Sequence, residues 1–179
     1  MIDDQRATSI YNAQGTWNFQ PDIIDSQTII AGTYTGLTTL NRVADKWETA
    51  DVTGLEESCR FVEQDEHGIW VAHPYRGIFK VTRPGGETEV AVFDERHGLP
   101  SRLQNHLFKI KNEIVFCAER GVYEYDALNN RFVPSEFFNG VFGENAKVRR
   151  LQETATGDVW FITENEFGKI NLTENGPDR

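Results

Sequence analysis

The chain has 179 residues, of which 39% are hydrophobic and 26% charged, a composition typical of one globular domain. Its formal net charge is −10 at pH 7, so its electric field repels phosphate backbones and anionic membrane surfaces. These properties argue against nucleic-acid binding. No apolar run approaches the roughly eighteen residues that a membrane span needs.

The N-terminal part of the chain predicts strand structure without a complete sheet of its own. It begins with the acidic sequence MIDDQR, which is unlike a secretory signal, and reaches the strand-like run GTWNF at residues 15–19. This run comes too soon before the next apolar segment to form a whole unit. We therefore expect residues 1–19 to supply part of a preceding or closing sheet.

Four segments in the rest of the chain resemble one another. Each has an apolar run, a short polar turn, a glycine and a second β-rich run. The turn glycines, 41, 44 and 47 residues apart, are Gly36, Gly77, Gly121 and Gly168. The bulky centres of the apolar runs, 40, 46 and 44 residues apart, are Ile30, Trp70, Phe116 and Trp160. A period in the forties that contains strands is typical of propeller blades.

The repeat divides the chain into four predicted blades. Their intervals are residues 20–50, 51–94, 95–133 and 134–172, with a tail at 173–179. The last interval has room for only three strands, and no segment has helical periodicity over ten or more residues. We predict an all-β fold of about four four-stranded antiparallel β-propeller blades. They are either a fragment of a larger propeller or a ring that closes with a second copy.

The recurring bulky residues have a structural interpretation. Blades pack face to face, so each needs a large apolar group near its middle. We therefore expect Trp70 and Trp160 to lie between blades rather than to bind a ligand. The two cysteines are too few for a disulfide framework, and Cys117 lies in a strongly apolar run. We expect both thiols to be free.

Polar and aromatic side chains gather at one predicted face of the propeller. Strand order places the second-to-third-strand turns and the loops between blades on the same face. Such groups suit a sugar, which needs planar side chains and paired hydrogen-bond donors and acceptors. The candidate ligand-binding residues of the turns are Tyr34, His73, Tyr75, Arg76, Glu119, Arg120, Glu164 and Asn165. The loops add Glu57, His97, Arg102 and Asn105.

Two alternatives remain for these side chains. They could be solvated loop tips with surface ion pairs of little energetic weight. Arg76 and Arg120, which precede equivalent glycines, could instead hold an acidic ligand group, or anchor neighbouring blades. The histidines lack paired metal-ligand spacing, and no phosphate loop or nucleophile elbow is present. We therefore predict no metal, no cofactor and no catalytic residue.

Several short motifs resemble the two-component regulator propeller repeat. They are HGLPS at residues 97–101, DEHGIWV at 65–71 and RGIF at 76–79, with partial copies at 54–58 and 156–160. The resemblance covers about residues 20–172. The chain departs from the repeat where Ile30 and Phe116 replace its tryptophan.

This resemblance implies a non-catalytic, ligand-sensing segment of a bacterial signal-transduction regulator. The regulators concerned are Bacteroidetes-type hybrid two-component or triple-tyrosine-domain proteins. Their propellers lie in the periplasm, usually respond to oligosaccharides, and control a histidine kinase or a DNA-binding domain elsewhere in the parent chain. One alternative is a protein-interaction or self-association propeller, including a homodimer. Another is a propeller lactonase or lyase.

Overall fold

The computed structural model describes residues 7–12, 15–83 and 87–172, and its strands form four antiparallel sheets. Blade 1 consists of β1 (Thr16–Pro21), β2 (Thr28–Thr33), β3 (Leu37–Val43) and β4 (Lys46–Asp51). Blade 2 consists of β5 (Phe61–Asp65), β6 (Gly68–His73), β7 (Gly77–Thr82) and β8 (Glu89–Phe93). Blade 3 consists of β9 (His106–Ile110), β10 (Glu113–Cys117), β11 (Val122–Asp126) and β12 (Arg131–Pro134). Blade 4 consists of β13 (Val148–Glu153), β14 (Asp158–Thr163) and β15 (Phe167–Asn171).

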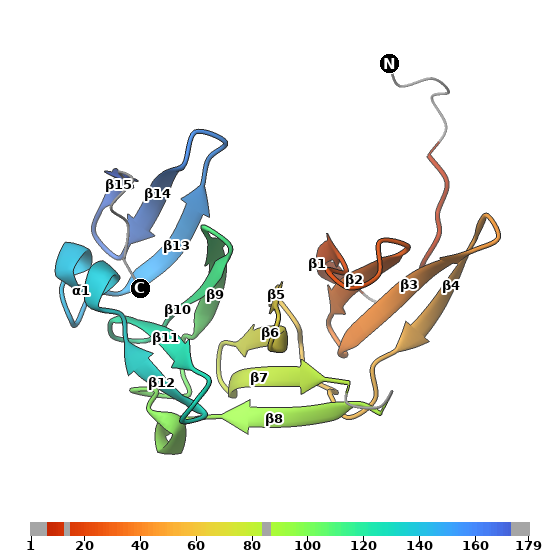
Figure 1. Cartoon of the computed structure of the whole chain (residues 1–179), viewed down its shortest axis with the longest axis horizontal. Coiled ribbons are helices and arrows are strands. Elements are labelled where there is room, and N and C mark those ends of the chain that lie inside the picture. The colour runs from red at the N-terminus through yellow and green to blue at the C-terminus, as the bar shows by residue number, and fades with distance from the viewer. Residues whose placement is uncertain (1–6, 13–14, 84–86, 173–179) are drawn as a thin grey trace.

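The four sheets follow one another in an open arc (Figure 1). In each sheet the strands pair in chain order, so each sheet is a meander. The first strands, β1, β5, β9 and β13, line the inner side of the arc, whereas β4, β8 and β12 lie toward its outside (Figure 1). This arrangement confirms the predicted all-β propeller blades. No helix in the described ranges is long and apolar enough to cross a membrane.

Loops between the blades carry two short helices. The linker from blade 2 to blade 3 contains the 3-10 helix η2 (Glu95–His97), and the linker from blade 3 to blade 4 contains α1 (Glu136–Phe142). Ser135 caps α1, because its side chain accepts a hydrogen bond from the backbone N–H of Phe138. Each linker returns the chain from the outer strand of one blade to the inner strand of the next (Figure 1).

A separate apolar core lies between each pair of consecutive blades. We call the side of a sheet that meets the following blade its forward face, and the other side its rear face. In blade 2, Trp70 and Ile78 on the forward face pack with Phe116 of blade 3. Val71 on the rear face belongs to the core shared with blade 1. Alternation along the strand therefore serves two interfaces at once.

The tryptophan motif of blade 2 has a local explanation. Asp65 ends β5 and accepts hydrogen bonds from the backbone N–H of His67 (2.8 Å) and from Nε1 of Trp70 (2.9 Å). Gly68 follows with a φ of 138°, and a Cβ there would meet the carbonyl oxygen of Val81. The motif DEHGIWV thus builds a tight turn and satisfies the only polar atom of a buried indole.

Strand register corrects two positions of the predicted repeat. The four second-to-third-strand hairpins close at the pairs Thr33–Gly36, His73–Gly77, Ala118–Gly121 and Thr163–Glu166. The residue three positions before the first member of each pair is structurally equivalent in the four blades. These equivalent residues are Ile30, Trp70, Val115 and Trp160. Phe116 therefore occupies the rear face, where its ring lies 5.2 Å from that of Trp70, and Gly168 lies inside β15 rather than at the turn.

The first and last blades differ from the sequence-based predictions, and the prediction for residues 1–19 is wrong. Residues 1–19 were expected to serve a preceding or closing sheet, but β1 begins at Thr16 and pairs with β2 to complete blade 1. Trp160, which is expected between blades, lies on the forward face of blade 4 with 41% of its surface exposed, and no blade of the described structure packs against this face. The parts of the predicted end segments at residues 1–6, 13–14 and 173–179 lie outside the described residues.

The two aligned tryptophans provide a matched test of blade packing. Trp70 is fully buried, so Trp70→Ala is expected to lower the free energy of unfolding by about 3–5 kcal/mol. Trp160→Ala removes the same side chain from a partly exposed face, so it should lower the free energy of unfolding by clearly less. Urea denaturation of both variants in dilute solution measures the difference. Equal losses would contradict the assignment of Trp70 to an inter-blade core.

The hairpin glycine of blade 2 gives a second test. Gly77 has a φ of 92°, and an added Cβ would meet the carbonyl oxygen of Phe93. We expect Gly77→Ala to lower the free energy of unfolding by more than about 1 kcal/mol. Gly140 in α1 has nothing within 4 Å of an added Cβ, so Gly140→Ala should be neutral or stabilising. Thermal or urea unfolding compares the two variants, and the reverse order would contradict the register.

Candidate functional site

The second-to-third-strand turns and the blade linkers lie at the same end of the sheets, as the strand order requires. Backbone hydrogen bonds join three of the turns to the linker that follows. The N–H groups of Cys59, Gln104 and Gly121 donate to the carbonyl oxygens of Thr33, Pro74 and Ala146 at 2.9, 2.7 and 2.9 Å. In each of the first three blades, the turn and the linker that follows therefore form one continuous surface.

Two predicted site residues of blade 2 converge on a carboxylate from the preceding linker. Glu57 lies 3.8 Å from Nε2 of His73 through one oxygen and 3.8 Å from Nε of Arg76 through the other. Nδ1 of His73 accepts a hydrogen bond from the backbone N–H of Tyr75 at 3.1 Å. This bond leaves Nε2 as the protonated nitrogen of the neutral ring, directed at Glu57.

A second polar group joins blade 4 to the linker before blade 3. Glu164 lies 3.2 Å from Nζ of Lys147 and 3.7 Å from a guanidinium nitrogen of Arg149. Arg149 also donates a 2.7 Å hydrogen bond to the side-chain oxygen of Gln104. Since the N–H of Gln104 binds Pro74, polar contacts run from the turn of blade 2 to the turn of blade 4.

We call these residues the turn-end cluster. Its members are Glu57, His73, Arg76, Gln104, Arg149 and Glu164. Arg76 and Glu164 are exposed, whereas the side chains of His73 and Glu57 are largely covered. The cluster therefore has a partly buried base and charged groups that a ligand can reach.

Burial and positive charge act together on two histidines at this end. Burial lowers the pKa of His73 below its ordinary value, Glu57 opposes the shift, and Arg76 and Arg60 add to it. Burial also lowers the pKa of His106, and the nearby Arg149 and Arg60 contribute. Both histidines are therefore favoured in their neutral form beside a group of arginines.

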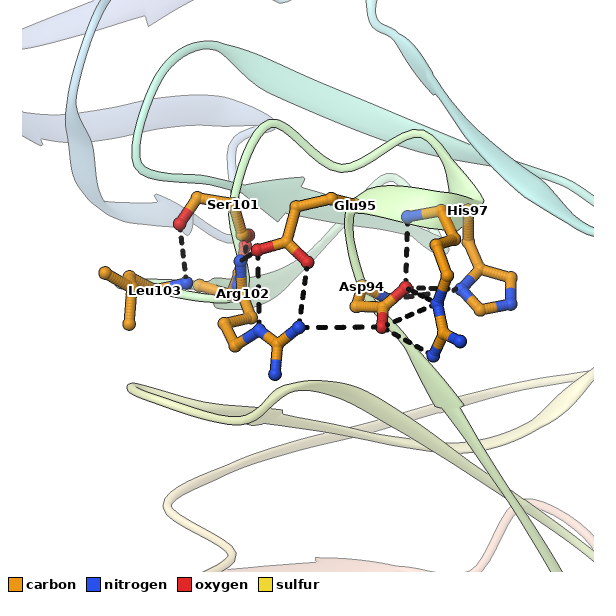
Figure 2. A network of polar contacts seen from close by, with 8 residues as sticks. Asp94, Glu95, His97, Ser101, Arg102 and Leu103 are labelled. Carbon is orange, nitrogen blue, oxygen red and sulfur yellow. Dashed lines mark hydrogen bonds and ion pairs between the residues drawn. The ribbon is translucent and has the colours of Figure 1, made fainter.

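The linker between blades 2 and 3 is held by its own polar network (Figure 2). Asp94 accepts hydrogen bonds from Nε and a terminal nitrogen of Arg96, and these bonds hold the pKa of Asp94 well below its ordinary value. Arg102 binds Glu95 through its backbone N–H (3.0 Å) and its guanidinium (3.3 Å), as Figure 2 shows. The network fixes the loop that presents Gln104.

Three of the four linker residues of the predicted set are used within the fold. His97 and Arg102 take part in the network of Figure 2. Asn105 is buried, with 1% of its surface exposed, and its side-chain NH₂ donates to the carbonyl oxygen of Ser101 at 3.1 Å. Asn105 was expected on the ligand-facing surface, and its burial corrects that expectation.

Of the remaining predicted residues, Tyr75 borders the turn-end cluster through His73, and the others make their contacts elsewhere. Tyr34 packs against Trp17 with the two rings tilted and their centroids 4.5 Å apart, and the guanidinium of Arg60 lies 4.0 Å from the centroid of the Trp17 ring. Tyr75 is exposed beside His73. Arg120 acts on Tyr123, where its charge opposes the burial that raises the pKa of this tyrosine. The partly exposed Glu119 and the exposed Asn165 belong to the turns of blades 3 and 4.

Sequence reasoning missed several members of this surface. Arg60, Gln104, His106 and Arg149 lie at or just before the start of the inner strands β5, β9 and β13. The turn residues were found because they precede periodic glycines, whereas the inner-strand residues have no such marker. Their signal would have been a polar residue at the start of three successive inner strands.

The chemistry available here is polar recognition. Aromatic rings, amides, carboxylates and guanidinium groups can hydrogen-bond hydroxyl and acidic groups of a ligand. Within the described ranges no three His, Cys, Asp or Glu side chains are grouped so that they could hold a metal ion. Cys59 and Cys117 are buried and free, and burial raises the pKa of Cys59 to about 12.

Comparisons with known proteins establish a likeness in fold. No family model matches the chain, so the repeat family named from its motifs stays a resemblance, and no curated protein matches it either. The chain is similar to the extracellular domain of the putative one component system BT4673 from B. thetaiotaomicron, with 23% identity and a TM-score of 0.60. That alignment covers 86% of this chain and 20% of the other.

Two further solved structures from B. thetaiotaomicron are similar to this chain. A structure of the extracellular domain of the putative hybrid two component system BT4673 is 22% identical, with a TM-score of 0.59 over 94% of this chain and 22% of that one. The extracellular domain of the putative hybrid two component system BT3049 is 15% identical, with a TM-score of 0.61 over 89% and 21%. The chain therefore spans about a fifth of the length of these structures.

The neutral histidines predict a pH-dependent stability. A histidine whose pKa is lowered in the folded protein binds a proton more readily in the unfolded chain. Its contribution to the free energy of unfolding is therefore complete above about pH 6.5, and it is lost as the pH falls through the folded-state pKa. We expect the urea midpoint to fall as the pH drops below about 6.5. His106→Gln and His73→Gln should each reduce that fall. An unchanged pH profile in both variants would contradict the prediction.

Proposed function

We propose that this chain is a non-catalytic, ligand-sensing segment of a bacterial signal-transduction regulator, located in the periplasm. The shared fold supports this proposal, because the similar structures are extracellular domains of putative one component and hybrid two component systems. A histidine kinase or a DNA-binding domain elsewhere in a longer parent protein would supply the output. The blades themselves would then act as the input that a ligand changes.

The turn-end cluster is the observation that carries the proposal. It gathers side chains from blade 2, blade 4 and two linkers onto one surface through contacts between 2.7 and 3.8 Å. A ligand bound there would touch several blades at once. Because it would favour one relative placement of these blades, binding could be passed on as a shift between conformations. A surface confined to one loop would lack this property.

We propose an oligosaccharide as the ligand. Exposed Tyr34 and Tyr75 offer planar faces for sugar rings, and the cluster offers charged donors and acceptors for hydroxyl groups. Cations also gather at this end of a chain whose net charge is −10. They include Arg60, Arg76, Lys147 and Arg149, so sugars that carry a carboxylate should bind more tightly than neutral ones.

Isothermal titration calorimetry with neutral and carboxylated oligosaccharides tests this proposal. We expect binding of at least one acidic sugar, weakened about tenfold or more by Arg76→Ala or Tyr75→Ala, since each tenfold step corresponds to about 1.4 kcal/mol. Leu128→Ala is the matched control, because Leu128 is exposed in the β11–β12 turn at the opposite end of blade 3. A panel without any heat of binding would favour a protein-interaction propeller instead.

A further inference from the structure

Two sheet faces at the ends of the arc have no blade packed against them in the described structure. They are the forward face of blade 4 and the rear face of blade 1. Strand register allows each residue on these faces to be compared with its counterparts in the other blades. The comparison distinguishes positions that are exposed in every blade from positions that are buried wherever a neighbouring blade is present.

On the forward face, blade 4 exposes positions that the other blades bury. Trp160 aligns with Ile30, Trp70 and Val115, all of which are buried. Phe167 aligns with Leu37, Ile78 and Val122, which are also buried, yet 71% of Phe167 is exposed. The rings of Trp160 and Phe167 stack at 5.3 Å and form an apolar surface with Ile162. A surface of this kind is costly to leave in water.

On the rear face, blade 1 shows the complementary exposure. Phe19 pairs with Ala31 and aligns with Val62, Leu107 and Leu151 of the three later blades. Each of these three side chains is 2% exposed, because the preceding blade covers it. Phe19 is 73% exposed. This position is thus buried in blades 2, 3 and 4 and exposed in blade 1.

We propose that a second copy of this chain covers both faces in a head-to-tail dimer. Every blade contact within the chain joins a forward face to a rear face, and the two uncovered faces are one of each kind. They belong to the first and last blades, on either side of the open part of the arc (Figure 1). Two arcs related by a twofold axis would form two identical contacts and close into one ring.

The chemistry of an internal interface indicates how the new contact would form. In blade 2, Lys80 pairs across the ladder with Trp70 and its Nζ reaches the hydroxyl of Tyr125 in blade 3 at 3.3 Å. Lys169 pairs with Trp160 in the same way in blade 4. The forward face of blade 4 thus repeats the tryptophan and lysine that dock onto blade 3. Repulsion between two chains of charge −10 opposes association, so added salt should strengthen it.

Sedimentation equilibrium of the chain at increasing concentration tests the dimer. We expect a species of twice 20.4 kDa that becomes more populated at higher salt. Because both contacts need both faces, Phe167→Asp and Phe19→Asp should each give monomers. Mixing these two variants should restore part of the dimer, since one of its contacts then joins two unaltered faces. Leu128→Asp, at an exposed position away from both faces, should stay dimeric.

Circular dichroism distinguishes loss of the dimer contact from misfolding. Both variants alter exposed residues, so both should keep the wild-type spectrum. A wild-type chain that stays monomeric at all concentrations would overturn the proposal. A dimer that tolerates Phe19→Asp would also overturn it, since contact between two blade 4 faces alone would explain that result. Species larger than two copies would overturn ring closure.

Discussion

The structure depends on the packing of one sheet's forward face against the next sheet's rear face. The interface between blades 2 and 3 shows how it works, with Trp70 buried among Phe93, Phe116, Phe132 and Tyr125 at ring distances of 4.6–6.1 Å. Each strand places alternate residues on opposite faces, so one sheet can serve two such interfaces. The hairpin turns of successive blades are brought to one end of the molecule because these interfaces fix the sheets side by side.

The turn-end cluster is a product of that packing. His73 and Arg76 meet Glu57 only because the linker between blades 1 and 2 returns to the same end as the β6–β7 turn. The backbone bond between Pro74 and Gln104 then joins the turn to the next linker, and the network around Asp94 holds that linker in place. The turn-end cluster therefore rests on loops whose positions are set by rigid sheets, as the proposed ligand surface requires.

The sequence was informative wherever a residue type was tied to a local turn or to a fixed period. Gly36, Gly77 and Gly121 were located correctly because each hairpin needs its special backbone conformation. Phe116 was placed on the wrong face because β10 is apolar on both sides, and such a run does not reveal its register. Arg149 and Gln104 were missed as partners because their contact joins positions 45 residues apart, which no local pattern encodes.

The outermost strand of blade 4 has a consequence for solubility. In the described part of the chain β15 ends its sheet, whereas the other three blades have a further strand at this place. A bare strand edge is a template for unwanted strand addition, and proteins blunt such edges with lysine and with residues that disfavour strands. β15 carries both kinds, Lys169 and Gly168, in its middle. The short strand can therefore border solvent with a reduced tendency to seed fibrous aggregates.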